Sequence, residues 1–291
     1  MKILLIIITL LFSACTFKNT PHMEELTQEA LQKETHEGII YKDVLYKSTL
    51  FYDLHLDIYE PLKASTKPVP VYIYIHGGSW LRGNKNLVNL YDKTILALRK
   101  AGVAVVSIDY RFVSEAGIKA MVEDCADAVT FLQDNATKYN LNMKRLALHG
   151  HSAGGNLALV TGFKLQEEGN HLLFIADEYG PTDAVRLMKE KENAPWWSSL
   201  IPDSSLELIS PIRQIPKTLP PMYIAHGDKD VTVPISHSEA LYKAVKAQHG
   251  EVTFQVVHGA QHGYAGVDDK TIATHRQEVL AFMLKRFKTT L

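Results

Sequence analysis

The chain alternates between short runs of consecutive apolar residues and longer segments whose apolar residues recur at helical spacing. The short runs predict buried strands at Val71–Ile75, Val103–Ile108, Arg145–Leu148, Leu172–Ala176, Met222–Ala225 and Val252–Val257. The longer segments predict helices at Leu87–Lys100, Ile118–Tyr139, Gly154–Glu168, Ser236–Gln248 and Thr271–Lys288. Apolar strands that alternate with helices are typical of a mostly parallel sheet with helices on both faces. The pattern therefore predicts an α/β fold.

Two departures from this alternation add detail to the predicted fold. Gly38–Tyr46 and Leu54–Tyr59 precede it, and the second of them alternates apolar with polar residues. That period is typical of a half-exposed antiparallel strand, so we expect an antiparallel pair at one edge of the sheet. Residues 181–221 contain Pro, Trp and Ser and are too long for a plain connection. They predict a short cap-like insert over the carboxyl edge of the sheet.

The N-terminus has the pattern of an export signal. Met1 and Lys2 precede an apolar run, Ile3–Phe12, which is too short to span a membrane but typical of a signal-peptide core. The run ends in Leu11-Phe12-Ser13-Ala14-Cys15, which resembles a bacterial lipobox. We therefore expect a lipoprotein signal peptide over 1–14, lipidation of Cys15, and a membrane tether over 15–36. The protein would then be an exported bacterial membrane lipoprotein on the periplasmic or cell-surface side; ordinary secretion and an uncleaved anchor are the alternatives.

Composition narrows the possible partners. The chain has 291 residues, of which 46% are hydrophobic and 22% charged, and these values suit one large folded domain. The formal net charge is -1, without a long run of like charge, so we expect no nucleic-acid partner. If Cys15 is lipidated, Cys125 remains single and no disulfide forms within the chain. We expect neither a metal nor a cofactor.

The segment Gly150-His151-Ser152-Ala153-Gly154 is the most informative motif. It follows an apolar strand and precedes a helix of small residues. This is the pattern of a nucleophile elbow, in which a tight strand-to-helix turn presents a serine hydroxyl at the top of an α/β sheet. The motif alone occurs by chance in roughly one chain in ten of this length, so its partners decide its meaning.

A second glycine-rich turn, His76-Gly77-Gly78, directly follows the strand Val71–Ile75. Backbone N–H groups of Gly77 and Gly78, together with that of Ala153, are suited to bind the oxyanion of an acyl-transfer intermediate. His76 itself is expected to be structural.

An acid and a base follow the last two predicted strands. Asp228 and Asp230 come after Met222–Ala225, and either carboxylate is able to orient a histidine. His258 and His262 come after Val252–Val257, and position favours His262 as the proton acceptor. Nucleophile, acid and base then follow one another in the chain order expected of this fold.

These motifs together resemble those of α/β-hydrolases. The likeness extends over about Tyr41 to Arg286 and rests on His76-Gly77-Gly78-Ser79-Trp80, Gly150-His151-Ser152-Ala153-Gly154-Gly155, Gly227-Asp228-Lys229-Asp230 and His262-Gly263. It is closest to feruloyl- and acetyl-xylan-esterase-like carboxylesterases, a group related to the hormone-sensitive-lipase family. Ser79 stands where hormone-sensitive-lipase relatives usually carry a third glycine, and His151 where they carry an acidic residue.

The resemblance implies an α/β-hydrolase domain over 37–291 and a catalytic triad of Ser152, Asp230 and His262. It also implies hydrolysis of small carboxylic esters through an acyl-enzyme, with short-chain acyl groups, acetyl or feruloyl, on carbohydrate. An amide hydrolase, such as an arylformamidase or a peptidase, is the alternative enzyme. A catalytically retired carbohydrate-binding lipoprotein is the alternative that is not an enzyme. Four aromatic residues are candidates for the substrate pocket: Trp80, Tyr179, Trp196 and Trp197.

Overall fold

The computed structural model describes residues 37–190 and 203–288. The predicted signal peptide and tether, as well as Trp196 and Trp197, lie outside these residues. None of the helices among the described residues combines the length and apolar character needed to cross a membrane.

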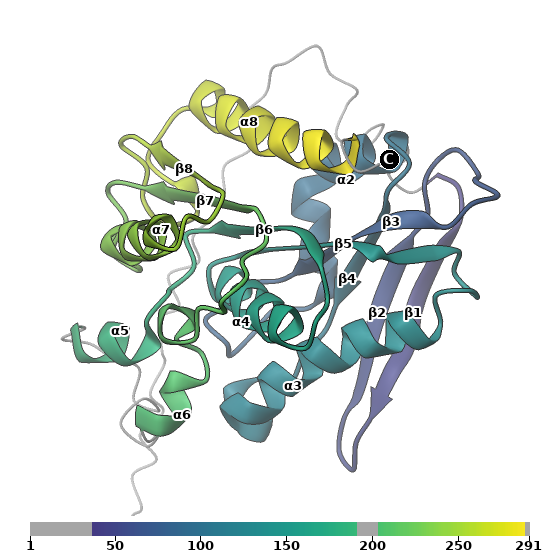
Figure 1. Cartoon of the computed structure of the whole chain (residues 1–291), viewed down its shortest axis with the longest axis horizontal. Helices are drawn as coiled ribbons and strands as arrows, with labels where there is room; N and C mark the ends of the chain where they lie inside the picture. The colour runs from purple at the N-terminus through teal and green to yellow at the C-terminus, as the bar shows by residue number, and fades with distance from the viewer. Residues whose placement is uncertain (1–36, 191–202, 289–291) are drawn as a thin grey trace, which may run out of the picture.

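An eight-stranded sheet forms the centre of the fold (Figure 1). Its strands follow the order β1-β2-β4-β3-β5-β6-β7-β8. Their bounds are β1 Ile40–Ser48, β2 Asp53–Tyr59, β3 Val69–Ile75, β4 Ala104–Ile108, β5 Leu141–His151, β6 Leu172–Glu178, β7 Met222–Gly227 and β8 Val252–Val257. β1 pairs with β2, and β2 with β4, in antiparallel fashion, whereas all other pairs are parallel. The predicted α/β-hydrolase fold, with its antiparallel edge, is confirmed.

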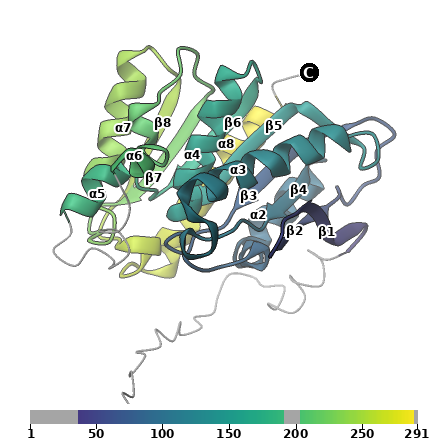
Figure 2. The same cartoon turned by 90° about the horizontal axis from the view of Figure 1, so that it is seen from below.

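Helices cover both faces of this sheet (Figures 1 and 2). The helices longer than one or two turns are α2 Asp92–Lys100, α3 Val113–Asp134, α4 Ala153–Glu167, α7 Ser236–Ala247 and α8 Asp269–Lys288. α3, α4 and α7 pack on one face, and α2 and α8 on the other. Between β6 and β7 lie the short helices α5 Ala184–Glu190 and α6 Asp203–Glu207 and the 3-10 turn η3 Pro211–Arg213.

The two-residue period of the strands divides the core between the faces. In β3, Val71 and Ile73 contact the core under α3 and α4, whereas Tyr72 and Tyr74 point to the core under α2 and α8. Burial of these side chains stabilises each layer by roughly 25 cal/mol per Å² of apolar surface. Parallel strands aligned in this way place their carboxyl ends at one edge, which is where side chains for chemistry gather.

Candidate active site

Ser152 lies in a strained turn between β5 and α4. Its φ of 54° and ψ of -124° are unusual for a residue with a side chain. The turn requires glycine on both sides, because a Cβ on Gly150 would lie 2.2 Å from the carbonyl oxygen of Gly154, and one on Gly154 would lie 2.1 Å from that of Ile75. This backbone packing explains the glycine spacing of the motif and directs the serine hydroxyl away from the sheet.

Ser152, His262 and Asp230 form a continuous line of hydrogen bonds. Ser152 Oγ lies 2.9 Å from His262 Nε2, and His262 Nδ1 lies 2.7 Å from Asp230 Oδ2. The other carboxylate oxygen of Asp230 accepts the backbone N–H groups of Thr232, at 2.8 Å, and Val233, at 2.9 Å. The structure thus brings together the serine, the histidine and one of the two aspartates that the sequence singles out.

The environment of Asp230 keeps it ionised. Burial by itself raises the pKa of this carboxyl, but hydrogen bonds from His226 and His262 outweigh burial and hold the pKa far below its usual range. His226 lies 3.2 Å from Asp230 Oδ2 and also contacts the carbonyl oxygen of Val233, at 2.8 Å. An ionised Asp230 accepts a hydrogen bond from the N–H at Nδ1 of His262. The proton of the neutral ring is then on Nδ1, so the Nε2 lone pair is free to accept the proton of Ser152.

The other predicted acid and base form a separate pair. Asp228 Oδ2 lies 3.0 Å from His258 Nδ1, and Asp228 Oδ1 accepts the N–H of Gly259 at 2.7 Å. The His258 side chain is 84% exposed, and neither residue of this pair has a hydrogen bond to Ser152. Two aspartate–histidine pairs therefore arise where the loops after β7 and β8 run side by side.

The glycine turn after β3 lies directly against the elbow. A Cβ on Gly77 would come within 2.7 Å of the His151 carbonyl oxygen and 3.5 Å of the Ser152 Cβ. Within the described chain, the N–H groups of Gly77, Gly78 and Ala153 donate to no other group. Ala153 is also the first residue of α4, where N–H groups have no partner within the helix and the helix dipole favours negative charge.

His76 takes no part in the proton path. Its ring stacks on Tyr110 with centroids 4.3 Å apart, and the Tyr110 hydroxyl donates to its carbonyl oxygen at 2.8 Å. Burial lowers the pKa of His76 to about 4, so the ring is neutral near pH 7. It supports the turn that carries Gly77, in agreement with its expected structural role.

The aromatic candidates for the pocket differ in position. Trp80 is only 4% exposed and belongs to the core under α3 and α4, so the structure places it behind the site and not on an open wall. Tyr179 directly follows β6, and its ring meets that of His262 edge-on at a centroid distance of 4.9 Å. Tyr179 therefore contacts the line from Ser152 to Asp230 at His262.

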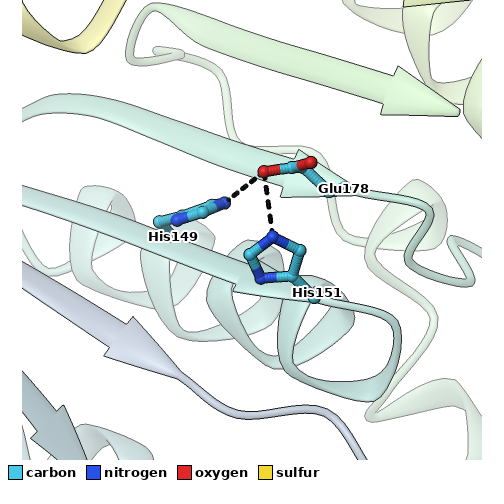
Figure 3. A group of neighbouring side chains, drawn as sticks. All are labelled: His149, His151 and Glu178. Atoms are coloured by element: carbon cyan, nitrogen blue, oxygen red, sulfur yellow. Dashed lines mark hydrogen bonds and ion pairs between the residues drawn. The ribbon is translucent and has the colours of Figure 1, made fainter. Parts of the chain in front are cut away.

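Sequence reasoning missed a cluster of side chains beside the elbow. His149 and His151 on β5 and Glu178 on β6 point toward one another (Figure 3). Each offers one metal-binding atom, and these three atoms all lie within 4.8 Å of one another. One signal was available: residues two apart on a strand share a face, which places His149 and His151 together. Nothing local indicated Glu178.

The sheet, the elbow and the serine–histidine–aspartate line define an α/β-hydrolase of the serine type. Residues 56–245 match the model of the BD-FAE family, and the chain belongs to that family. The matching segment covers most of the sheet, including the glycine turn, the elbow and Asp230.

Several known esterases are similar to this chain. The esterase LipC of Mycobacterium tuberculosis is 24% identical over 233 residues, which are 73% of this chain and 57% of LipC. An acetyl esterase of Salmonella dublin is 24% identical over 274 residues, or 83% of this chain and 79% of that protein. The chain thus spans just over half the length of LipC.

Among solved structures, a truncated carbohydrate esterase from gut microbiota superposes with a TM-score of 0.72 at 26% identity, over 87% of this chain and 97% of that one. An esterase of Thermogutta terrifontis superposes with a TM-score of 0.70 at 21% identity, over 88% and 94% of the two chains. The second likeness shows the fold alone.

Proposed function

We propose that the protein is a serine hydrolase that cleaves carboxylic esters through an acyl-enzyme. One observation carries this proposal: Ser152, His262 and Asp230 are joined by hydrogen bonds of 2.9 and 2.7 Å in the order that proton transfer requires. The family and the esterases similar to this chain support the same reaction.

The first half of the reaction acylates Ser152. Its hydroxyl attacks the ester carbonyl while His262 Nε2 accepts the proton, and Asp230 stabilises the imidazolium that forms. The N–H groups of Gly77, Gly78 and Ala153 receive the negative oxygen of the tetrahedral intermediate. His262 then gives its proton to the departing alcohol, which leaves an ester on Ser152.

The second half returns the enzyme to its starting state. A water molecule takes the place of the alcohol, His262 accepts a proton from it, and the resulting hydroxide attacks the acyl carbonyl. The same N–H groups hold the second oxyanion. The carboxylic acid leaves after His262 returns the proton to Ser152.

For the substrate we propose short-chain acyl esters, with acetyl or feruloyl groups on carbohydrate. The similar proteins that are named acetyl esterase and carbohydrate esterase support this class. The assay therefore covers several acyl groups.

The test is hydrolysis of p-nitrophenyl acetate and butyrate by the wild type and the Ser152→Ala variant. We expect the variant to lose on the order of 10⁶-fold in kcat, because the nucleophile carries the chemistry. A wild type no faster than the variant rejects the proposal. Methyl ferulate, acetylated xylan and formyl-kynurenine complete the panel, and faster turnover of the formyl amide than of any ester replaces the esterase proposal by an amidase.

We further propose that the enzyme is exported and tethered to a membrane through Cys15, on the lipobox-like sequence that precedes this residue. Incorporation of a labelled fatty acid into the wild type in bacteria, but not into the Cys15→Ser variant, is the expected result. Equal labelling of the two proteins contradicts the proposal.

A further inference from the structure

One buried carboxylate, that of Glu178, joins three segments around the proposed active site. Its Oε1 accepts a hydrogen bond from His149 Nε2 on β5 at 2.9 Å (Figure 3). Its Oε2 accepts hydrogen bonds from the Tyr264 hydroxyl at 2.8 Å and from His275 Nε2 on α8 at 2.7 Å. His151 Nε2 lies 3.0 Å from Oε1. We call these five residues the Glu178 cluster.

The cluster holds a negative charge away from water. Burial alone raises the pKa of Glu178, but the surrounding histidines outweigh it and lower that pKa well below the usual range. Burial lowers the pKa of His151 to about 4, so this ring is neutral at pH 7. Hydrogen bonds that a buried anion accepts are strong and directional, so the side chains around Glu178 have little freedom.

Two of the connections lead to the catalytic line. The carbonyl oxygen of Glu178 accepts the N–H of Ser152 at 2.9 Å, so this residue supports the strained elbow through its main chain. Its side chain holds Tyr264, which lies two residues beyond His262 in the 3-10 turn η4, His262–Tyr264. The ring of Tyr179 meets those of both His262 and Tyr264 edge-on, each at 4.9 Å.

The backbone of Tyr264 is strained, so the contacts of this residue have to hold it in place. Its φ is 60°, a left-handed value that is unfavourable for a bulky side chain. A residue keeps such a conformation only when its surroundings hold it there. The N–H of Tyr264 donates to the Gln261 carbonyl oxygen at 3.0 Å, and the hydrogen bond from its hydroxyl to Glu178 fixes the far end of the buried side chain, so both contacts oppose relaxation of the turn.

His149, His151 and Glu178 are also residue types that bind a divalent metal. The distances between them favour direct hydrogen bonds to the Glu178 carboxylate instead. Ligand atoms about 2.0–2.1 Å from a tetrahedral zinc ion lie about 3.3 Å apart, whereas the two imidazole nitrogens lie 2.9 and 3.0 Å from Glu178 Oε1. The Arg276 side chain lines the same small cavity, of about 30 Å³, as His149 and Glu178. A guanidinium there opposes a second cation.

We propose that Glu178 is a positioning residue of the hydrolase, which acts through Tyr264 to hold His262 in line with Ser152. This inference rests on the proposed function. It assigns to Glu178 no contact with substrate, so its loss is expected to slow the chemical step and leave substrate binding unchanged.

Tyr264→Phe tests this role, with Tyr46→Phe as the matched control. Both changes remove one buried tyrosine hydroxyl, but that of Tyr46 donates to the Asp109 carbonyl oxygen at 2.6 Å, and Tyr46 lies on β1, at the opposite edge of the sheet from β8. We expect Tyr264→Phe to lower kcat about tenfold with KM within about twofold, because a misplaced base is costly for the rate. Tyr46→Phe is expected to keep both constants within about twofold, at a similar loss of Tm.

A double variant then tests the route through the carboxylate. Glu178→Gln keeps the shape of the side chain and removes its charge, and it is expected to lower kcat at least as much as Tyr264→Phe. If the two residues act as one unit, the kcat of the combined variant is no lower than that of the less active single variant. If Glu178→Gln does not fold, the comparison of the two tyrosine variants still decides the matter.

Three results separate the possible failures. An inactive wild type rejects the proposed function and leaves the positioning role without a reaction to serve. An active wild type with equal kcat values for Tyr264→Phe and Tyr46→Phe overturns the positioning role alone. One equivalent of zinc in the purified wild type, by elemental analysis, with loss of activity on its removal by a chelator, overturns it in favour of a metal site.

Discussion

Replacement of Asp230 by asparagine tests which of the two aspartate–histidine pairs of this protein takes part in catalysis. Asparagine keeps the size of the side chain, and its single carbonyl oxygen is able to accept the N–H groups of Thr232 and Val233, as one carboxylate oxygen does now. Those two bonds turn the amide nitrogen toward His262. The amide then donates to Nδ1, the proton of the ring moves to Nε2, and Nε2 can no longer accept the proton of Ser152.

The size of the effect follows from this change of tautomer. The wrong tautomer in a serine–histidine–acid line lowers kcat by about 10³- to 10⁴-fold, or about 4 to 5.5 kcal/mol in the barrier. Asp228→Asn is the matched control, since Asp228 bonds to His258 and Gly259 and has no contact with His262. We expect this control to stay within about twofold of the wild type.

The assay is kcat and KM on p-nitrophenyl acetate at pH 7, together with Tm for each variant. A loss of less than tenfold in kcat for Asp230→Asn, or a larger loss for Asp228→Asn, refutes the role of Asp230. A low Tm of Asp230→Asn shows when its loss of kcat is due to unfolding. In that case Asp230→Glu, which keeps the charge, is compared with the wild type.

Three further predictions concern the elbow and the strand beside it. Gly154→Ala places a Cβ 2.1 Å from the Ile75 carbonyl oxygen, so we expect a loss of several kcal/mol in urea unfolding; an unchanged midpoint contradicts the packing argument. Ser152→Gly is expected to be about 1 kcal/mol more stable than Ser152→Ala, because glycine relieves the strain at a φ of 54°; equal stability means that the turn is not strained. Burial raises the pKa of Asp177 to about 7, so the native carboxyl keeps a proton that the unfolded chain loses near pH 4, and the contribution of Asp177 to the stability of the wild type falls as the pH rises from 4 to 7. Asp177→Asn lacks this loss, so its Tm relative to the wild type is expected to be higher at pH 8 than at pH 5, and a pH-independent difference contradicts the shift.

The sheet was predictable because burial on both faces leaves apolar runs that a single sequence displays. The predicted strand at Arg145–Leu148 nevertheless extends over Leu141–His151 in β5. Its neighbours explain the difference, since Gly150 pairs with Ile75 of β3 and His151 pairs with Glu178 of β6. Glycine is a poor strand residue by itself, and only tertiary pairing keeps it in the sheet.

The residues of the proposed triad were recognisable for a different reason. Parallel strands end at one edge, so loops after successive strands meet there whatever their sequence. The choice of Asp230 over Asp228 came from family resemblance, and the hydrogen bond to His262 now gives it a geometric basis. The burial of Trp80 in the core was not predictable, because nothing in the sequence indicates its left-handed backbone, with a φ of 60°.

The Glu178 cluster had no signature in the sequence. Glu178 is separated by 29 positions from His149, by 86 from Tyr264 and by 97 from His275. No periodicity joins such residues; they meet only because the register of β5 and β6 and the packing of α8 on the sheet bring them together. A charged residue at the end of an apolar strand indicates at most a loop boundary.

Backbone strain connects these observations to function. Among the described residues, several that have a positive φ despite a side chain lie in the turns around the elbow: Ser79, Trp80, Ser152, Tyr179 and Tyr264. Each such conformation costs about 1–3 kcal/mol and persists only where surrounding contacts fix it. Those contacts are visible, since the N–H of Ser152 bonds to the Glu178 carbonyl oxygen and that of Tyr179 to the Ala225 carbonyl oxygen at 2.7 Å. The regular sheet thus offsets the strain at its carboxyl edge, where the turn places the Ser152 hydroxyl 2.9 Å from His262 Nε2.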